Sequence, residues 1–121
     1  MFTFNFEKLD AWREAIQFAN LIYQLTSKFP EKERFGLINQ MRRAAVSVSS
    51  NLAEGSSRVS RTDFSRFVEI ATGSLFEVVS QANVSLNQHF LERPDYERIV
   101  GAAEKQCRML SGLRRSLGRA S

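Results

Sequence analysis

Apolar residues recur along most of the chain at the three- and four-residue spacing of amphipathic helices. Four segments have this spacing, and residues that stop or start helices separate them. Pro30 ends the first segment, and Gly55 followed by two serines ends the second. Ser60 with Asp63 resembles a capping box that starts the third, and Pro94 lies in the first turn of the fourth. The pattern predicts helices over residues 8–28, 33–54, 61–91 and 94–117.

The connections between these helices are only two to six residues long, which favours antiparallel packing of consecutive helices. A chain of 121 residues, 43% of them hydrophobic, can bury a core without disulfide bonds. We therefore expect the all-α fold class, with residues 1–121 forming a single domain. The expected architecture is an antiparallel up-down-up-down four-helix bundle.

The second predicted helix carries an unusual polar strip, formed by Gln40, Arg43, Ser47, Asn51 and Glu54. A solvated helix face normally carries long charged residues, whereas serine and asparagine compete with the backbone for hydrogen bonds. We interpret the polar strip as a structural seam or subunit interface rather than a binding surface. In this interpretation Arg43 and Glu54 find partners within the subunit or in a neighbouring one, and fix the register of packing.

The third predicted helix is apolar around most of its circumference, because Ile70, Phe76 and Val84 lie well outside its main apolar stripe. A helix of this kind is buried on more than one side. With only four helices in the chain, we expect its second side to contact another copy of the protein. Gly73 and Ser74 are small enough to let a neighbouring helix approach closely, so both belong to the candidate interface.

The excess positive charge lies at the C-terminal end of the chain. The net charge is +4, and residues 99–121 contain five basic residues against one acidic residue. Four of them, which we call the basic stripe, fall within about 80° of one helix face. The basic stripe consists of Lys105, Arg108, Arg115 and Arg119. Arg114 points away from it. Such a stripe is typical of a protein that binds phosphate backbones, but it also fits a solvated face that complements the helix dipole.

Catalytic and metal-binding patterns are absent from the sequence. The chain has one histidine, His89, and Leu86 occupies the position where a di-metal bundle would need glutamate. No glycine-rich phosphate loop occurs, and no residue is placed to orient His89 and Cys107 as a catalytic pair. We therefore expect no enzyme activity, no metal and no cofactor, and we interpret Cys107 as a core or interface residue.

The sequence also gives expectations about location. The longest apolar runs fall short of the roughly 20 residues that cross a bilayer, and the N-terminus lacks the features of a signal peptide. We expect a cytoplasmic protein that does not associate with membranes.

Several motifs together resemble a known family. The densest is Gln40, Arg42, Arg43, Ala44, Ala45, Ser47, Asn51, Ala53, Glu54 and Gly55. Others are Phe6, Leu9, Trp12, Tyr23, Phe29, Pro30 and Glu33 before it, and Phe64, Arg66, Phe67, Ala71, Gly73, Ser74 and Glu77 after it. With these motifs the chain resembles the four-helix-bundle family encoded in intervening sequences of bacterial 23S ribosomal RNA genes. Phe35 and Ser50 depart from that pattern, where tyrosine and proline are usual.

The resemblance implies an antiparallel four-helix bundle that assembles into closed rings, typically of five subunits, with a positively charged surface. Related accessory proteins of diversity-generating retroelements bind nucleic acid and a reverse transcriptase. The name of the family records the location of its genes and implies no activity.

Two hypotheses of function follow. The first is a non-enzymatic homo-oligomeric accessory protein, expected as a pentamer, that associates with structured RNA or DNA through its basic surface. The second is a protein-binding scaffold with no nucleic-acid ligand, whose partner could be a protein such as a reverse transcriptase. The basic stripe favours the first hypothesis, and salt-dependent nucleic-acid binding discriminates between the two.

Overall fold

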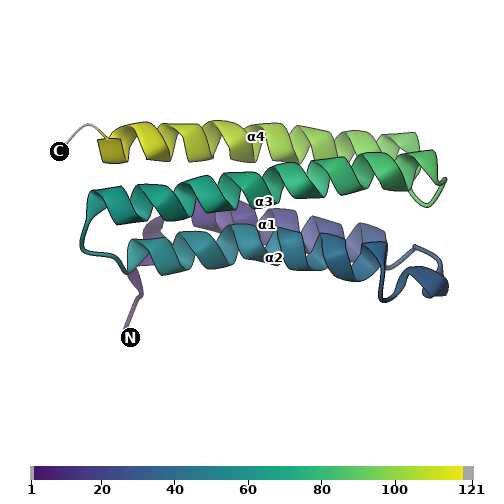
Figure 1. Ribbon diagram of the computed structural model, residues 1–121, viewed down its shortest axis with the longest axis horizontal. Helices are drawn as coiled ribbons and strands as arrows, with labels where there is room; N and C mark the ends of the chain where they lie inside the picture. The colour runs from purple at the N-terminus through teal and green to yellow at the C-terminus, as the bar shows by residue number, and fades with distance from the viewer. Residues whose placement is uncertain (1, 119–121) are drawn as a thin grey trace.

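The computed structural model describes residues 2–118 and contains four long helices packed side by side (Figure 1). The helices are α1 (Asp10–Thr26), α2 (Leu37–Ser56), α3 (Arg61–Asn87) and α4 (Arg93–Gly118). Two short 3₁₀ turns, η1 (Asn5–Lys8) and η2 (Glu31–Glu33), precede α1 and α2. Consecutive helices run antiparallel, and α1 also packs against α4, which closes the bundle. The predicted fold class and up-down-up-down architecture are confirmed.

The ends of α2 differ from the boundaries that the sequence pattern predicts. The helix begins at Leu37 rather than at residue 33, because η2 precedes it in the chain and the Glu33 carboxylate accepts a hydrogen bond from the Leu37 amide (3.2 Å). Gly55 does not end the helix, which continues to Ser56. Gly55 is buried instead, and the position that a Cβ would occupy faces α3. Its role is therefore to let two helices come close together.

The chain leaves α3 at Asn87, four residues before the predicted end. His89 adopts a positive φ of 64°, which turns the backbone out of the helix. The amides of Phe90 and Leu91 then both donate to the carbonyl of Ser85 (2.9 and 3.3 Å). These bonds satisfy a carbonyl at the end of α3 and direct the chain into α4.

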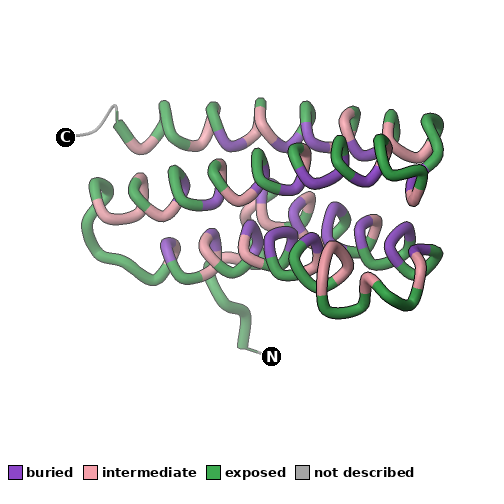
Figure 2. The backbone as a smooth tube through the Cα atoms, turned by 45° about the vertical axis from the view of Figure 1, so that its right-hand side comes forward, coloured by how far each residue is buried: buried purple, intermediate pink, exposed green. Residues whose placement is uncertain are grey.

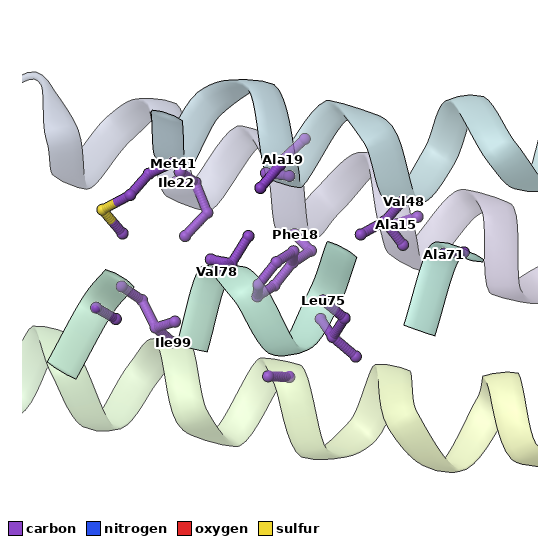
Figure 3. Close-up of a cluster of buried hydrophobic side chains, with 14 of the residues drawn as sticks. Ala15, Phe18, Ala19, Ile22, Met41, Val48, Ala71, Leu75, Val78 and Ile99 are labelled. Atoms are coloured by element: carbon purple, nitrogen blue, oxygen red, sulfur yellow. The ribbon is translucent and has the colours of Figure 1, made fainter. Parts of the chain in front are cut away.

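The core lies along the bundle axis, where each helix contributes its apolar stripe (Figure 2). Phe18 and Ile22 from α1 face Met41 from α2, Leu75 from α3 and Ile99 from α4 (Figure 3). All five side chains are almost fully buried. Burying a side chain of this size contributes roughly 1.5–3 kcal/mol, so this layer is a major source of stability.

One buried polar contact links the first and last helices. Gln106 of α4 is fully buried, and its amide nitrogen donates to the backbone carbonyl of Ala11 in α1 (3.1 Å). The other amide atom of Gln106, Oε1, has no hydrogen-bond partner among the described residues. This contact restricts how α4 can slide along α1, while the unpaired oxygen reduces its net stabilisation.

Polar groups also hold the junction between α3 and the end of α4. The Ser60 hydroxyl accepts a hydrogen bond from the Asp63 amide (3.1 Å), so the predicted N-terminal cap of α3 is present. The Arg61 guanidinium donates to the carbonyls of Ser116 (3.2 Å) and Leu117 (3.3 Å). A cation at the C-terminal end of a helix is favourable because the last carbonyls carry partial negative charge.

The outer side of α3 exposes large apolar residues. Ile70, Phe76 and Val84 are 50%, 62% and 46% exposed. These are the residues that the sequence pattern placed outside the main stripe, and within the described chain nothing covers them. None of the described helices combines the length with the apolar character that crossing a membrane requires.

Candidate functional site

The basic stripe on α4 divides into residues with and without an acidic partner. Lys105 forms an ion pair with Glu14 of α1 (3.2 Å). Arg108 and Arg115 are exposed, and neither forms an ion pair with a described carboxylate. Arg119 lies outside the described residues. Within the described part of the basic stripe, Arg108 and Arg115 are therefore the residues without an acidic partner.

The remaining arginine of this region has a different environment. Arg114 forms an ion pair with Glu69 of α3, in agreement with its predicted direction away from the basic stripe. Next to it, Ser111, Arg114 and Arg115 line an open hollow on the surface of α4. The α3–α4 junction described above holds this end of α4 in place. Arg115 is thereby presented from an ordered helix rather than from a frayed end.

The structure brings two residues of the polar strip together with Ser74, a third candidate residue. The hydroxyls of Ser47 on α2 and Ser74 on α3 form a hydrogen bond (2.9 Å). The amide nitrogen of Asn51 donates to the backbone carbonyl of Ser47 (2.8 Å) and to its hydroxyl (3.0 Å). All three side chains are half-buried. Hydrogen bonds inside the subunit therefore account for this part of the polar strip, which joins α2 to α3.

The ends of the polar strip do not take part in this network. Glu54 pairs with Arg58 in the next turn (3.3 Å), and both side chains are well exposed. Gln40 and Arg43 are exposed at the other end, where neither side chain has a hydrogen-bond or ion-pair partner among the described residues. A role for these residues in a subunit interface remains a prediction.

Gly73 has open space around it, in contrast to Gly55. A Cβ at position 73 would meet no atom within 4 Å, so the glycine is not required by packing inside the subunit. A Cβ at Gly55 would lie 2.7 Å from the Cβ of Phe67 and 2.9 Å from Cδ1 of Phe64. Within the subunit, helices therefore approach closely at Gly55, and the approach of a neighbouring subunit at Gly73 remains a prediction.

A second cationic site, which the sequence pattern did not predict, lies on the outer side of α2 and the adjoining end of α1. It is an open cavity of ≈ 620 Å³. Nine residues line it: Tyr23, Arg34, Ile38, Asn39, Arg42, Arg43, Val46, Ser47 and Ser50. Three of these are arginines and none is acidic. We call this cavity the arginine pocket.

The arginine pocket and the basic stripe occupy different parts of the bundle. α2 and α4 are diagonal helices that do not contact each other, and they run in the same direction (Figure 1). Arg42 and Arg43 lie on the first half of α2, whereas Arg108 and Arg115 lie on the second half of α4. The arginines of the two helices are therefore separated both around and along the bundle.

Sequence reasoning missed the pocket because the charge balance of residues 1–98 is neutral. The acidic residues that balance this count do not line the pocket; examples are Asp10 beside Arg13 and Asp63 beside Arg66. The available signal was the recurrence of arginine at positions 34, 42 and 43, within ten residues of one another.

The structure does not assemble the catalytic pair considered from the sequence. Cys107 is half-buried in a shallow apolar groove between α3 and α4, and His89 is exposed in the connection before α4. Cys107 lies fourteen residues after Arg93, which begins α4, or about 20 Å along the helix axis. Across residues 2–118, no cluster of three or more His, Cys, Asp or Glu side chains is suited to hold a metal ion.

Known proteins place the chain in a family. The family model described as 23S rRNA-intervening sequence protein matches residues 7–112. The fold is similar to a crystal structure from Bacteroides thetaiotaomicron VPI-5482, described as a protein with unknown function from the S23 ribosomal protein family. That match has a TM-score of 0.77 and 21% sequence identity, and it covers 86% of this chain and 97% of that chain. No curated protein sequence matches. Since the family model spans most of the chain, including α1 to α3 and most of α4, the protein belongs to the 23S rRNA-intervening sequence protein family.

Proposed function

We propose that the protein is a non-enzymatic, homo-oligomeric accessory protein that associates with the backbone of structured RNA or DNA through α4. The observation that carries this proposal is the exposure of Arg108 and Arg115 on one helix without a described acidic partner. Both guanidinium groups are free to form hydrogen bonds with phosphate oxygens. Binding of this kind depends on charge and shape and carries little sequence specificity.

Oligomerisation would strengthen this weak contact. Two arginines in one subunit give a small electrostatic attraction, but a symmetric assembly repeats them around one surface. A ring of five subunits, each with a net charge of +4, would carry about +20. At a Debye length of roughly 8 Å, adjacent patches would act together on one nucleic-acid backbone.

The exposed apolar side of α3 supports the oligomer. Phe76 borders the groove between α3 and α4, together with Val79 and Val100, and is largely exposed. Ile70 and Val84 extend the apolar surface along α3. Light scattering on the purified protein tests this part of the proposal. A monomeric mass at micromolar concentration would contradict it.

The nucleic-acid part is tested with the double variant Arg108→Glu/Arg115→Glu and an RNA hairpin whose loop is a non-nucleotide linker, so that every nucleotide is paired. We expect wild-type affinity to fall steeply with salt concentration, and the double variant to lose binding at low salt. The control is Arg13→Glu/Arg98→Glu, which changes the net charge equally at exposed residues that already have acidic neighbours. Unchanged binding by the α4 variant would refute the proposal.

The alternative function, a protein-binding scaffold without a nucleic-acid ligand, draws on the same exposed apolar side of α3. It predicts no saturable binding to RNA or DNA at physiological salt, and pull-downs that recover a protein partner. The hairpin titration and the pull-down therefore separate the two functions.

A further inference from the structure

We propose that the arginine pocket binds an unpaired nucleotide of a nucleic-acid strand, with its phosphate on the arginines and its base against Tyr23 and Arg42. This inference rests on the proposed function insofar as both concern nucleic acid. The arginine pocket is separate from the α4 surface and lies on a different helix, and it would bind the base of the nucleotide as well as its phosphate.

The charge of the pocket identifies an anionic ligand. Arg34, Arg42 and Arg43 line the cavity, and no carboxylate does. The acidic partner of Arg34, Glu31, lies outside the cavity, and this ion pair of 3.3 Å is well exposed. Arg43 has no ion-pair partner among the described residues. Three arginines that line one cavity match the charge and the oxygen acceptors of a phosphate.

Arg42 is held in a fixed position, unlike the other two arginines. Its Nε donates to the Thr26 hydroxyl (2.9 Å) and its Nη2 donates to the Tyr23 carbonyl (3.3 Å). A guanidinium has five N–H donors, so the donors on Nη1 remain available to a ligand. Because α1 orients this side chain in advance, little side-chain entropy is lost when a phosphate binds.

The same contacts create a platform for a base. The guanidinium of Arg42 lies 4.5 Å from the centre of the Tyr23 ring, and Tyr23 is 46% exposed. Unpaired bases stack on aromatic rings and on arginine planes in proteins that bind single strands. Ile38 and Val46 add apolar surface to the cavity, and the amide of Asn39 can form hydrogen bonds with a base edge.

The size and the openness of the cavity favour a nucleotide within a strand. Its volume of ≈ 620 Å³ lies within the range of about 300–1,000 Å³ that is usual for ligand sites. The cavity opens to solvent, so a strand can enter and leave it. The bases of a duplex are stacked inside the helix and cannot reach Tyr23. Among the described residues of α4, no aromatic side chain accompanies Arg108 and Arg115, so that surface has no equivalent platform.

The test measures binding of the purified full-length protein to two fluorescent strands that differ in one feature. One is a short DNA strand without self-complementarity, and the other has the same backbone with abasic sites in place of the bases. We expect wild-type protein to prefer the strand with bases by at least about fivefold, the effect of one stacked base. We expect Tyr23→Leu to remove this preference. Equal wild-type affinity for the two strands would overturn the assignment of a base site.

Variants of the arginines separate this site from the α4 surface. Arg43→Glu is expected to weaken strand binding at least about tenfold while hairpin binding persists, and Arg108→Glu/Arg115→Glu is expected to show the opposite pattern. Arg43 is exposed and has no described partner, so its replacement leaves the fold intact; circular dichroism checks this. Unchanged strand binding by Arg43→Glu would refute the pocket, even if the α4 surface binds hairpins. Loss of strand binding in Arg43→Glu alone would support the pocket even if the α4 proposal failed.

Discussion

Replacing Gly55 with alanine tests how closely α2 and α3 are packed. The new Cβ would lie 2.7 Å from the Cβ of Phe67 and 2.9 Å from Cδ1 of Phe64. Carbon atoms in favourable contact are about 3.5–4.0 Å apart, so the neighbours must move by roughly 1 Å. The Cβ of Phe67 is fixed to the α3 backbone and cannot rotate away. The two helices must therefore separate, or the end of α2 must shift.

The expected free-energy change is the difference between two opposing effects. Overpacking of this kind costs about 1–3 kcal/mol. Alanine is favoured over glycine inside a helix by about 1 kcal/mol, but this gain is smaller here because Gly55 is in the last turn of α2. The net destabilisation is about 1–2 kcal/mol. At roughly 4 °C per kcal/mol for a domain of this size, Tm falls by about 4–8 °C.

The assay compares thermal and urea unfolding of wild type, Gly55→Ala and Gly101→Ala at one protein concentration. Gly101 lies inside α4 and is exposed, and a Cβ at this position would meet no atom within 4 Å. Alanine there is therefore expected to stabilise the protein by up to about 1 kcal/mol. The opposite signs of the two glycine substitutions are the diagnostic result. A Gly55→Ala protein that is as stable as Gly101→Ala would refute the close packing of α2 against α3.

Three further predictions address the core, a helix cap and the subunit contact. Gln106→Met removes one hydrogen bond together with a buried oxygen that has no described partner, so the free energy of unfolding in urea should change by no more than about 1 kcal/mol. Gln106→Ala also leaves a cavity and should lower this free energy by more than about 2 kcal/mol. Ser60→Ala removes the cap of α3 and should lower the unfolding free energy by about 1 kcal/mol in the same assay; no loss would mean that the cap is replaceable by water. Phe76→Glu places a charge on the exposed apolar side of α3 and should reduce the mass measured by light scattering, with Arg13→Glu as an exposed control that keeps the wild-type mass.

The arrangement of helices was predictable because its signals are local in sequence. The cap at Ser60 depends on a residue three positions away, and the apolar stripes depend on spacings of three and four. Short connections then leave few alternatives to antiparallel packing. The exact ends of α2 and α3 were less predictable, since a carboxylate at Glu33 and the backbone of His89 decide them.

The candidate sites were predictable only in part, because the sequence shows which residues are charged but not which residues they contact. Lys105 and Arg115 look equivalent in the basic stripe, yet Lys105 is paired with Glu14, which lies 91 positions earlier in the chain. Ser47 and Ser74 were separate candidates until the packing of α2 on α3 joined them in one hydrogen bond. The interface role proposed for Gly73 depends on a contact between subunits and stays a prediction.

The sequence by itself determined the four amphipathic helices, their order and the excess of positive charge on the last one, because these properties arise from residues within a few positions of each other. The tertiary structure decided which charges remain uncompensated and where a cavity forms. The arginine pocket illustrates the reason: Tyr23 of α1 reaches Arg42 of α2 only because the two helices pack antiparallel, with residues 27–36 connecting them. Electrostatic and stacking interactions act through space, so their partners are fixed by packing rather than by position along the chain.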